Sequence, residues 1–239
     1  DSNGLLFQGE TDAFIVDYDT AGQAVNLVYS GATVGWTPAS DIVSAFEPVA
    51  PTIQRAIFAF GFTSSNVSMS NLVSSSGVVG SDVTGVGTAR HYLAAVSYGG
   101  DKAIFGYGEN ASGYVSMTNL VNNSGVVAAD VSGVGTARTG LAAASYGGDK
   151  AIFGYGQIDG GAKSSLTNLV GNTGTVASDV SGVGTARAYL AAASYGGDKA
   201  IFGYGETGSY VSMTNLVNNS GVVAADVTGV GTARRLLAA

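Results

Sequence analysis

The sequence contains no cysteine, only 3 prolines and 1 histidine. The absence of cysteine excludes disulfide bonds and thiolate metal sites. Only 11% of the residues are charged, yet no run of about 20 apolar residues occurs, so we expect no insertion into a membrane. The net charge of −7 argues against nucleic acid as a partner, because binding to the phosphate backbone requires a basic surface.

Residues suited to catalysis are also scarce. With His91 as the single histidine and no cysteine, a Ser/His/Asp or Cys/His arrangement could occur once at most. A glycosidase needs two carboxylates facing one cleft, and the glutamates are only Glu10, Glu47, Glu109 and Glu206. No Asp-x-Asp-x-Asp-Gly loop that could bind calcium occurs. We therefore predict that the protein is not an enzyme and holds neither a metal nor a cofactor.

Glycine, in contrast, is abundant, and much of it lies in a repeated segment. The segment reads GVGTAR-xx-LAA-x-SYGGDKAIFGYG and occupies residues 85–108, 133–156 and 182–205. A fourth copy starts at Gly229 and stops after LAA at Ala239. A period of roughly 48 residues is typical of a propeller, a solenoid or another repeat array.

Each repeat contains several short strand patterns separated by glycine-rich turns. In the second copy and the stretch that follows it we expect strands at 141–145 (LAAAS), 150–155 (KAIFGY), 166–170 and 175–180. This is the pattern of one blade of a β-propeller. The alanine-rich first strand suits the centre of a small propeller, where the inner strands converge and leave little room.

The two ends of the repeated region complement each other. The last copy ends after LAA, and residues 54–61 repeat the DKAIFGYG block with no LAA strand before it. We therefore predict an all-β, four-bladed propeller over residues 54–239, closed by residues 55–61 pairing beside residues 235–239. The alternatives are an open array or a ring shared between chains.

Residues 1–53 lie outside the repeat and are predicted to form a small β module and linker. Alternating patterns predict strands at 12–18, 24–29 and 33–36, with a turn at 20–22. Residues 41–54 read as a linker or a short helix. Because a few strands alone are marginally stable, we expect the module to pack on another part, as the end of a longer fibre.

An aspartate precedes the arginine of every GVGTAR motif. The pairs are Asp82 and Arg90, Asp130 and Arg138, Asp179 and Arg187, and Asp226 and Arg234. We expect each pair to hold the crossover between two blades through charge-assisted hydrogen bonds. The motif lacks the GK[ST] sequence of a phosphate-binding loop.

The repeated MTNLV, GVGTAR, LAAAS and GGDKAIFGYG blocks resemble kelch-like repeats in tail-fibre and appendage proteins of phages, especially marine and cyanobacterial phages. The repeats end in Gly-Tyr-Gly and lack the usual tryptophan, so they resemble a divergent kelch repeat. Residues 24–36 also resemble a small module of such fibres. The resemblance implies a virion surface protein, commonly a homotrimer among other virion proteins, whose distal domain attaches to a host-surface receptor.

Binding is best placed where the repeats differ, which is in the pair after TAR and in the loop after Gly-Tyr-Gly. Aromatic faces beside amide and carboxylate groups suit sugar rings. We predict a ligand site in the loops at Asn110, Tyr114, Asp159, Lys163 and Tyr210, and a second patch at His91, Tyr92 and Tyr189. The expected ligand is a host-surface glycan or protein receptor. A purely structural fibre or surface-layer component is the alternative.

Overall fold

The computed structural model describes residues 6–7, 10–11, 27–29, 36–38 and 56–239. The chain divides into two compact units, Asp1–Thr52 and Ile53–Ala239, which are described separately. Among the described residues no helix is long and apolar enough to cross a membrane.

The first unit contains one small mixed sheet. Its strands are β1 (Leu6–Phe7), β2 (Glu10–Thr11), β3 (Leu27–Tyr29) and β4 (Trp36–Pro38), in the order β2-β1-β4-β3. β3 lies within the strand predicted at 24–29, and β4 begins where the strand predicted at 33–36 was expected to end. The predicted strand at 12–18, the turn at 20–22 and the linker at 41–54 lie outside the described residues.

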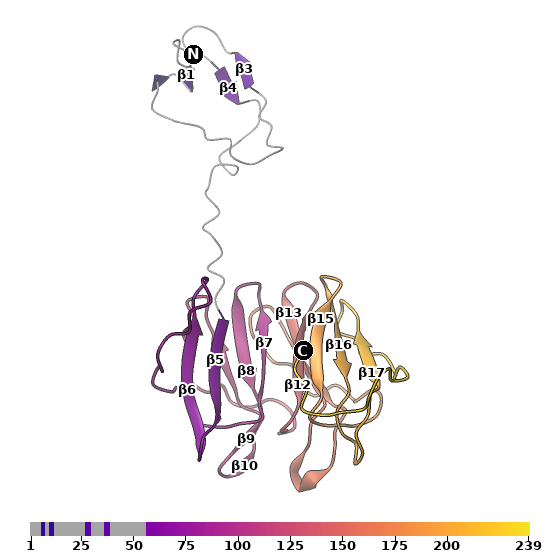
Figure 1. The fold of residues 1–239 in the computed structure, drawn as a ribbon. Coiled ribbons are helices and arrows are strands. Elements are labelled where there is room, and N and C mark those ends of the chain that lie inside the picture. Colours follow the sequence, from indigo (N-terminus) through magenta and orange to yellow (C-terminus); the bar gives the residue numbers. More distant parts are fainter. Residues whose placement is uncertain (1–5, 8–9, 12–26, 30–35, 39–55) are drawn as a thin grey trace. The chain divides into compact units, whose positions relative to one another are not determined.

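The second unit is all-β, as predicted, and it consists mainly of four successive antiparallel sheets (Figure 1). These are sheet 1 with β5 (Ala56–Phe62) and β6 (Asn66–Val73); sheet 2 with β7 (Ala94–Tyr98), β8 (Lys102–Gly106) and β11 (Thr118–Val121); sheet 3 with β12 (Ala142–Tyr146), β13 (Lys150–Gly154) and β14 (Thr167–Val170); and sheet 4 with β15 (Ala191–Tyr195), β16 (Lys199–Gly203) and β17 (Thr214–Val217). A hairpin of β9 (Glu109–Asn110) and β10 (Gly113–Tyr114) follows β8, and a 3-10 turn, η1 (Asp159–Gly161), follows β13.

The strands follow the apolar pattern of the repeat. In β12, Ala142, Ala144 and Tyr146 are buried while the residues between them are half-exposed, which is the alternation of a strand with one covered face. In the middle strand β13, Ile152 and Phe153 are both fully buried, because neighbouring sheets cover its two faces. Three of the four strands predicted for this repeat are therefore confirmed.

The fourth predicted strand, at 175–180, forms only isolated bridges. Val176 pairs with Val170 and Val180 pairs with Thr167, and the other three sheets have the same two bridges. This segment lies at the outer edge of its sheet, where Val180 is 45% exposed. With one face uncovered and one neighbour only, the segment follows its partner strand without forming a continuous ladder.

Successive sheets pack face to face through one aromatic contact. Phe153 of sheet 3 lies against Tyr107 of sheet 2, with ring centroids 5.2 Å apart. Its ring also covers Gly106, where an added Cβ would lie only 2.8 Å from the Phe153 Cζ. Phe202 makes the same contacts with Gly154 and Tyr155 of sheet 3, so the glycine before the aromatic residue lets the next sheet approach.

The predicted closing pair of strands is not formed. Within residues 56–239, β5 pairs only with β6, and none of the sheets closes on itself. The segment after Arg234 contains no strand; it turns back from sheet 4 toward the inner strands, where the C-terminus lies (Figure 1). There the backbone N–H of Leu236 donates to the carbonyl of Tyr189 at 2.9 Å. The C-terminal segment is thus held by a turn residue near sheet 4 and not by β5.

Candidate functional site

The two predicted patches lie at the same end of the array of sheets. The β9–β10 hairpin marks this end in Figure 1, and the Tyr-Gly-Gly-Asp turns lie at the other. The pair after TAR enters each inner strand here, and the loop after Gly-Tyr-Gly leaves each middle strand here. Isolated bridges join the two segments directly, as between His91 and Glu109 and between Ala188 and Glu206.

A line of backbone hydrogen bonds connects the second residue after TAR in successive repeats. Gly140 N–H donates to the Tyr92 carbonyl at 3.0 Å, and Tyr189 N–H donates to the Gly140 carbonyl at 2.7 Å. The bond from Leu236 to Tyr189 continues the line. We call these four residues the central ladder.

All four residues of the central ladder are in the left-handed region, which strains the three that are not glycine. Tyr92, Tyr189 and Leu236 have φ of 50°, 54° and 56°, a conformation that costs about 1 kcal/mol or more for a residue with a side chain. At Gly140 an added Cβ would lie 2.7 Å from the Tyr189 ring. The glycine therefore gives Tyr189 room, and the rings of Tyr92 and Tyr189 meet edge to face with centroids 5.9 Å apart.

Each variable loop sends one large side chain toward the next repeat. Gln157 Nε2 donates to the hydroxyl of Tyr114 at 2.7 Å. The Lys163 ammonium lies 3.8 Å from a carboxylate oxygen of Glu206. In the same way, the guanidinium carbon of Arg235 lies 5.4 Å from the centre of the Tyr210 ring. The loops therefore join their neighbours into one continuous surface.

Two cations flank the ring of Tyr189. Lys163 Nζ lies 5.4 Å and Arg235 Cζ 5.6 Å from its centroid, which are cation–π distances. Glu206 is the carboxylate that both cations share, and its ion pair with Arg235 is a direct contact. Burial, followed by the nearby Tyr114, Tyr92 and Glu206, raises the pKa of Tyr189.

We call this surface the tyrosine face, and it consists of Tyr92, Gln157, Lys163, Glu206, Arg235, Tyr114, Tyr189 and Tyr210. Tyr92 is 50% and Tyr210 55% exposed, whereas Tyr114 and Tyr189 are half-buried. His91 adjoins the face, with its ring 4.4 Å from that of Tyr92. Exposed aromatic side chains gathered in one place are typical of a binding surface.

The structure brings six of the eight predicted residues together and leaves two outside. Asn110 Oδ1 accepts a hydrogen bond from Ser112 N–H at 2.8 Å, and Asp159 Oδ1 accepts one from Gly160 N–H at 3.0 Å. Both side chains therefore serve their own turns. The prediction missed Gln157, Glu206 and Arg235, although all three occupy positions that differ between repeats.

The arginines of the GVGTAR motif belong to the framework and not to this face. Arg90 is fully buried; its Nε donates to the Tyr107 carbonyl at 2.9 Å and its Nη2 to Asn119 Oδ1 at 2.6 Å. The guanidinium also lies 4.2 Å above the Phe60 ring and 3.8 Å from Asp130. Burial lowers the pKa of Arg90 to about 10, and the charge of Asp130 partly offsets this. The side chain stays protonated at neutral pH.

The predicted partners of these arginines were wrong by one repeat. Arg90 pairs with Asp130, which lies after it in the chain, and not with Asp82, which lies before it. The same holds for Arg187, which pairs with Asp226. Each arginine comes just before the first strand of a sheet, and the aspartate with which it forms an ion pair lies at the outer edge of the same sheet. The pair therefore spans one sheet.

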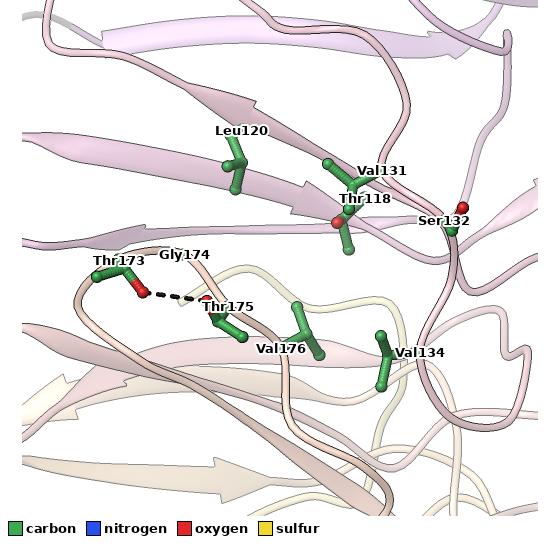
Figure 2. A pocket seen from close by; sticks show the side chains of 9 residues that line it. All are labelled: Thr118, Leu120, Val131, Ser132, Val134, Thr173, Gly174, Thr175 and Val176. Carbon is green, nitrogen blue, oxygen red and sulfur yellow. Dashed lines mark hydrogen bonds between the residues drawn. The ribbon is translucent and has the colours of Figure 1, made fainter.

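An apolar groove lies elsewhere, between sheets 2 and 3 (Figure 2). Its lining residues are Thr118, Leu120, Val131, Ser132, Val134, Thr173, Gly174, Thr175 and Val176. The hydroxyls of Thr173 and Thr175 hydrogen-bond to each other at 3.1 Å (Figure 2). No charged residue and no residue of the tyrosine face lines this groove. Among the described residues, no three His, Cys, Asp or Glu side chains are grouped to hold a metal ion.

Comparisons with known proteins are informative only about the fold. No family model and no curated protein sequence matches the chain. Among solved structures, the chain is similar to one described as the structure of YjhT, with a TM-score of 0.50 and 17% identity. The likeness covers 65% of this chain and 50% of that one, so the chain spans about half the length of YjhT.

Proposed function

We propose that the tyrosine face is a receptor-binding site for a glycan of a host-cell surface, carried at the distal end of a phage tail fibre or appendage. The observation that supports this most is the convergence of four tyrosines from two repeats at one end. The rest of the repeat varies little, and Arg90, Arg138 and Arg187, all fully buried, each donate to a buried asparagine. Variation in residue type and loop length concentrated at one exposed end is expected where a ligand, and not packing, determines the residues.

The chemistry of the tyrosine face suits a sugar. The exposed ring of Tyr210 can stack on the apolar face of a pyranose. Gln157, Glu206 and Lys163 supply donors and acceptors for hydroxyl groups beside it. The strained central ladder holds Tyr92 in one orientation, which limits the conformational entropy lost on binding.

We also propose that residues 54–239 form a closed, four-bladed kelch-like propeller, of which sheets 1 to 4 are the blades. The support is the central ladder, whose three hydrogen bonds connect four successive repeats. In addition, the rings of Tyr92 and Tyr189 are in contact, although these residues are two positions apart in the ladder, with Gly140 between them. Contact between side chains of alternate repeats is expected in a propeller with few blades, where the centre is narrow. The location on a virion, the homotrimer and the other virion proteins as partners are part of the same proposal.

Binding of the full chain to an array of bacterial surface glycans tests the function. We expect Tyr92→Ala combined with Tyr210→Ala to weaken binding about tenfold or more, which corresponds to the loss of about 1.4 kcal/mol of stacking energy. Val126→Ala, which removes an exposed side chain at the outer edge of sheet 2, is the control and should bind normally. If the native chain binds no glycan and no host cell, the structural alternative replaces this proposal.

A further inference from the structure

The three interfaces between neighbouring sheets share one set of contacts. Between sheets 3 and 4, Phe202 covers Gly154, and Arg187 lies 4.2 Å above the Tyr155 ring. Arg187 then donates to Asn215 Oδ1 at 2.6 Å and lies 3.8 Å from Asp226. One sheet thus supplies a small residue (glycine in sheets 2 and 3, Ala59 in sheet 1) and an aromatic ring, and the next supplies a phenylalanine, an asparagine and an aspartate.

Sheet 1 carries the second half of this set without a partner. Phe58, the counterpart of the fully buried Phe202, is 63% exposed. Asn71 donates to Asp82 at 2.8 Å, as Asn215 donates to Asp226, but no arginine among the described residues contacts either side chain. We call Phe58, Asn71 and Asp82 the leading edge.

Sheet 4 and the C-terminal segment carry the first half, also without a partner. Arg234 lies 4.2 Å above the Tyr204 ring and donates to the Thr232 carbonyl at 3.0 Å, as Arg187 does with Tyr155 and Thr185. Yet Arg234 is exposed, whereas Arg187 is fully buried. At Gly203 an added Cβ would meet only Thr214, at 3.3 Å, and no phenylalanine. We call Gly203, Tyr204, Thr232 and Arg234 the trailing edge.

A second pair of contacts repeats this mismatch at the opposite end of the sheets. An added Cβ on Gly221 of sheet 4 would lie 2.8 Å from Tyr146 of sheet 3, which is buried. In sheet 1 the corresponding Gly77 has nothing within 4 Å of such a Cβ. The tyrosine that corresponds to Tyr146 in sheet 4 is Tyr195, and it is 40% exposed.

We infer that the trailing edge docks on the leading edge of the same chain, so that Arg234 binds Asn71 and Asp82 and Phe58 covers Gly203. The new interface would have the same contacts as the three interfaces already present in the structure. The leading edge would supply the phenylalanine, asparagine and aspartate, and the trailing edge the glycine, aromatic ring and arginine. The occupant is the same chain because the central ladder leaves two free ends, the Tyr92 N–H and the Leu236 carbonyl, neither of which has a hydrogen bond in the described part of the chain. One bond between them would complete the ladder.

This inference rests on the closed form proposed above and adds a role in binding for the C-terminus. Arg234 is followed directly by Arg235, which contacts Glu206, Tyr189 and Tyr210 in the tyrosine face. Docking of Arg234 therefore fixes the backbone that presents Arg235. In this assignment Asp82 is a positioning residue for the binding surface, although it has no contact with that surface.

Thermal unfolding of matched variants tests the docking. In the open arrangement Asp82 contacts only Asn71, so Asp82→Ala would leave Tm unchanged while Asp130→Ala, which strips Arg90 of its carboxylate, would lower it. If the edges dock, both variants lose the same kind of contact, and we expect similar drops of roughly 4 °C or more. An unchanged Tm for Asp82→Ala beside a lowered Tm for Asp130→Ala would overturn the inference.

Cross-linking separates docking within one chain from docking between chains. The sequence has no cysteine, so Ser75→Cys with Gly196→Cys creates the only two thiols, both in exposed turns and outside the docked contacts. Their counterparts Asn219 and Gly147 lie against each other between sheets 4 and 3, where an added Cβ on Gly147 would be 3.0 Å from the Asn219 carbonyl oxygen. With a short bismaleimide we expect an intramolecular link in a monomer, located by mass spectrometry; Ser75→Cys alone is the control. Covalent dimers would overturn the assignment to one chain and show that copies join edge to edge. If neither link forms in the folded protein, docking itself is wrong.

These results can be separated from the outcome of the glycan-binding experiment. Loss of glycan binding in the variant of Tyr92 and Tyr210 with no effect of Asp82→Ala would leave the receptor site in place and remove the docking. If the cross-link confirms docking but the chain binds no glycan and no host cell, the docking stands and the receptor site is removed.

Discussion

Arg187 and Asp226 lie 3.8 Å apart at the two ends of one repeat, and between them they enclose the whole of sheet 4. The arginine is fully buried, while the aspartate is partly exposed at the outer edge. Thr185 also donates to this carboxylate, through its hydroxyl at 2.6 Å and its N–H at 3.0 Å. The start of each sheet is therefore fastened to its last segment, and this relationship determines how the fold responds to substitution and pH.

Removal of the buried asparagine in this network should be severe. Asn168 is fully buried, and its Oδ1 accepts a hydrogen bond from Arg138, whose Nε and Nη1 have no other partner. Asn168→Ala leaves a buried guanidinium without its acceptor, which costs about 3 kcal/mol or more. Urea unfolding measures the loss, and Asn122→Ala in an exposed turn is the control. Equal stability of the two variants would contradict the assigned role.

Stability should fall in acid because of the aspartates. Partial burial alone raises the pKa of Asp130, but hydrogen bonds from Thr88 and Asn119 and the charge of Arg90 hold it below its usual value. A carboxyl with a lowered pKa stabilises the fold above its unfolded pKa of about 4, and this contribution is lost as the pH falls through the lower folded value. We expect Tm to drop below about pH 4. A Tm that stays constant down to pH 2 would be the contrary result.

The tyrosine of the Gly-Tyr-Gly motif should set the alkaline limit. Burial raises the pKa of Tyr155 to about 12, and its hydroxyl donates to the Val183 carbonyl at 3.1 Å. Because the folded pKa exceeds the unfolded one, the stabilisation is complete below about pH 10 and is lost as the pH rises toward 12. Tyr155→Phe should cost about 1 kcal/mol at neutral pH and weaken this alkaline loss. Phe60 occupies the same position in sheet 1, so the ring alone is compatible with the fold.

The glycines beneath the aromatic rings should not tolerate a methyl group. In Gly154→Ala the new Cβ would lie 2.7 Å from the Phe202 Cζ, and the strain should cost about 1 to 3 kcal/mol. Gly171→Ala is the matched control, because nothing lies closer than 3.9 Å to its Cβ and its φ is not left-handed. Thermal unfolding that does not distinguish the two variants would refute the close packing of sheets 3 and 4.

Substitutions at Tyr114 should separate stacking from hydrogen bonding in the tyrosine face. Tyr114→Phe removes only the hydroxyl that accepts from Gln157, whereas Tyr114→Ala also removes the ring. If sugars stack on this ring, the phenylalanine variant should bind glycans within a few-fold of the native affinity and the alanine variant about tenfold more weakly. Equal losses would assign the contribution to the hydrogen bond.

The strands could be predicted because each depends on its local pattern. The alanine-rich strand at 142–146 and the Ile152–Phe153 strand have a spacing that no other element fits. The partner of Arg90 could not be predicted in this way, because the nearest aspartate in sequence, Asp82, belongs to the preceding sheet. Similarly, Gln157 and Arg235 join the tyrosine face only because loops lean toward the next sheet, which the spacing within one repeat does not reveal.

The near-identity of the interfaces between sheets makes the repeats interchangeable building units. A crossover between two copies of the coding sequence at Arg138 and Arg187 would delete one sheet, yet the new neighbours would still offer each other the same glycine, ring, phenylalanine and carboxylate. The framework therefore accommodates gain or loss of a unit at any junction. The tyrosine face does not, because the order Tyr92, Gly140, Tyr189 occurs only once in the chain. Recombination among the repeats would preserve a folded array while creating a new arrangement of side chains at its binding end.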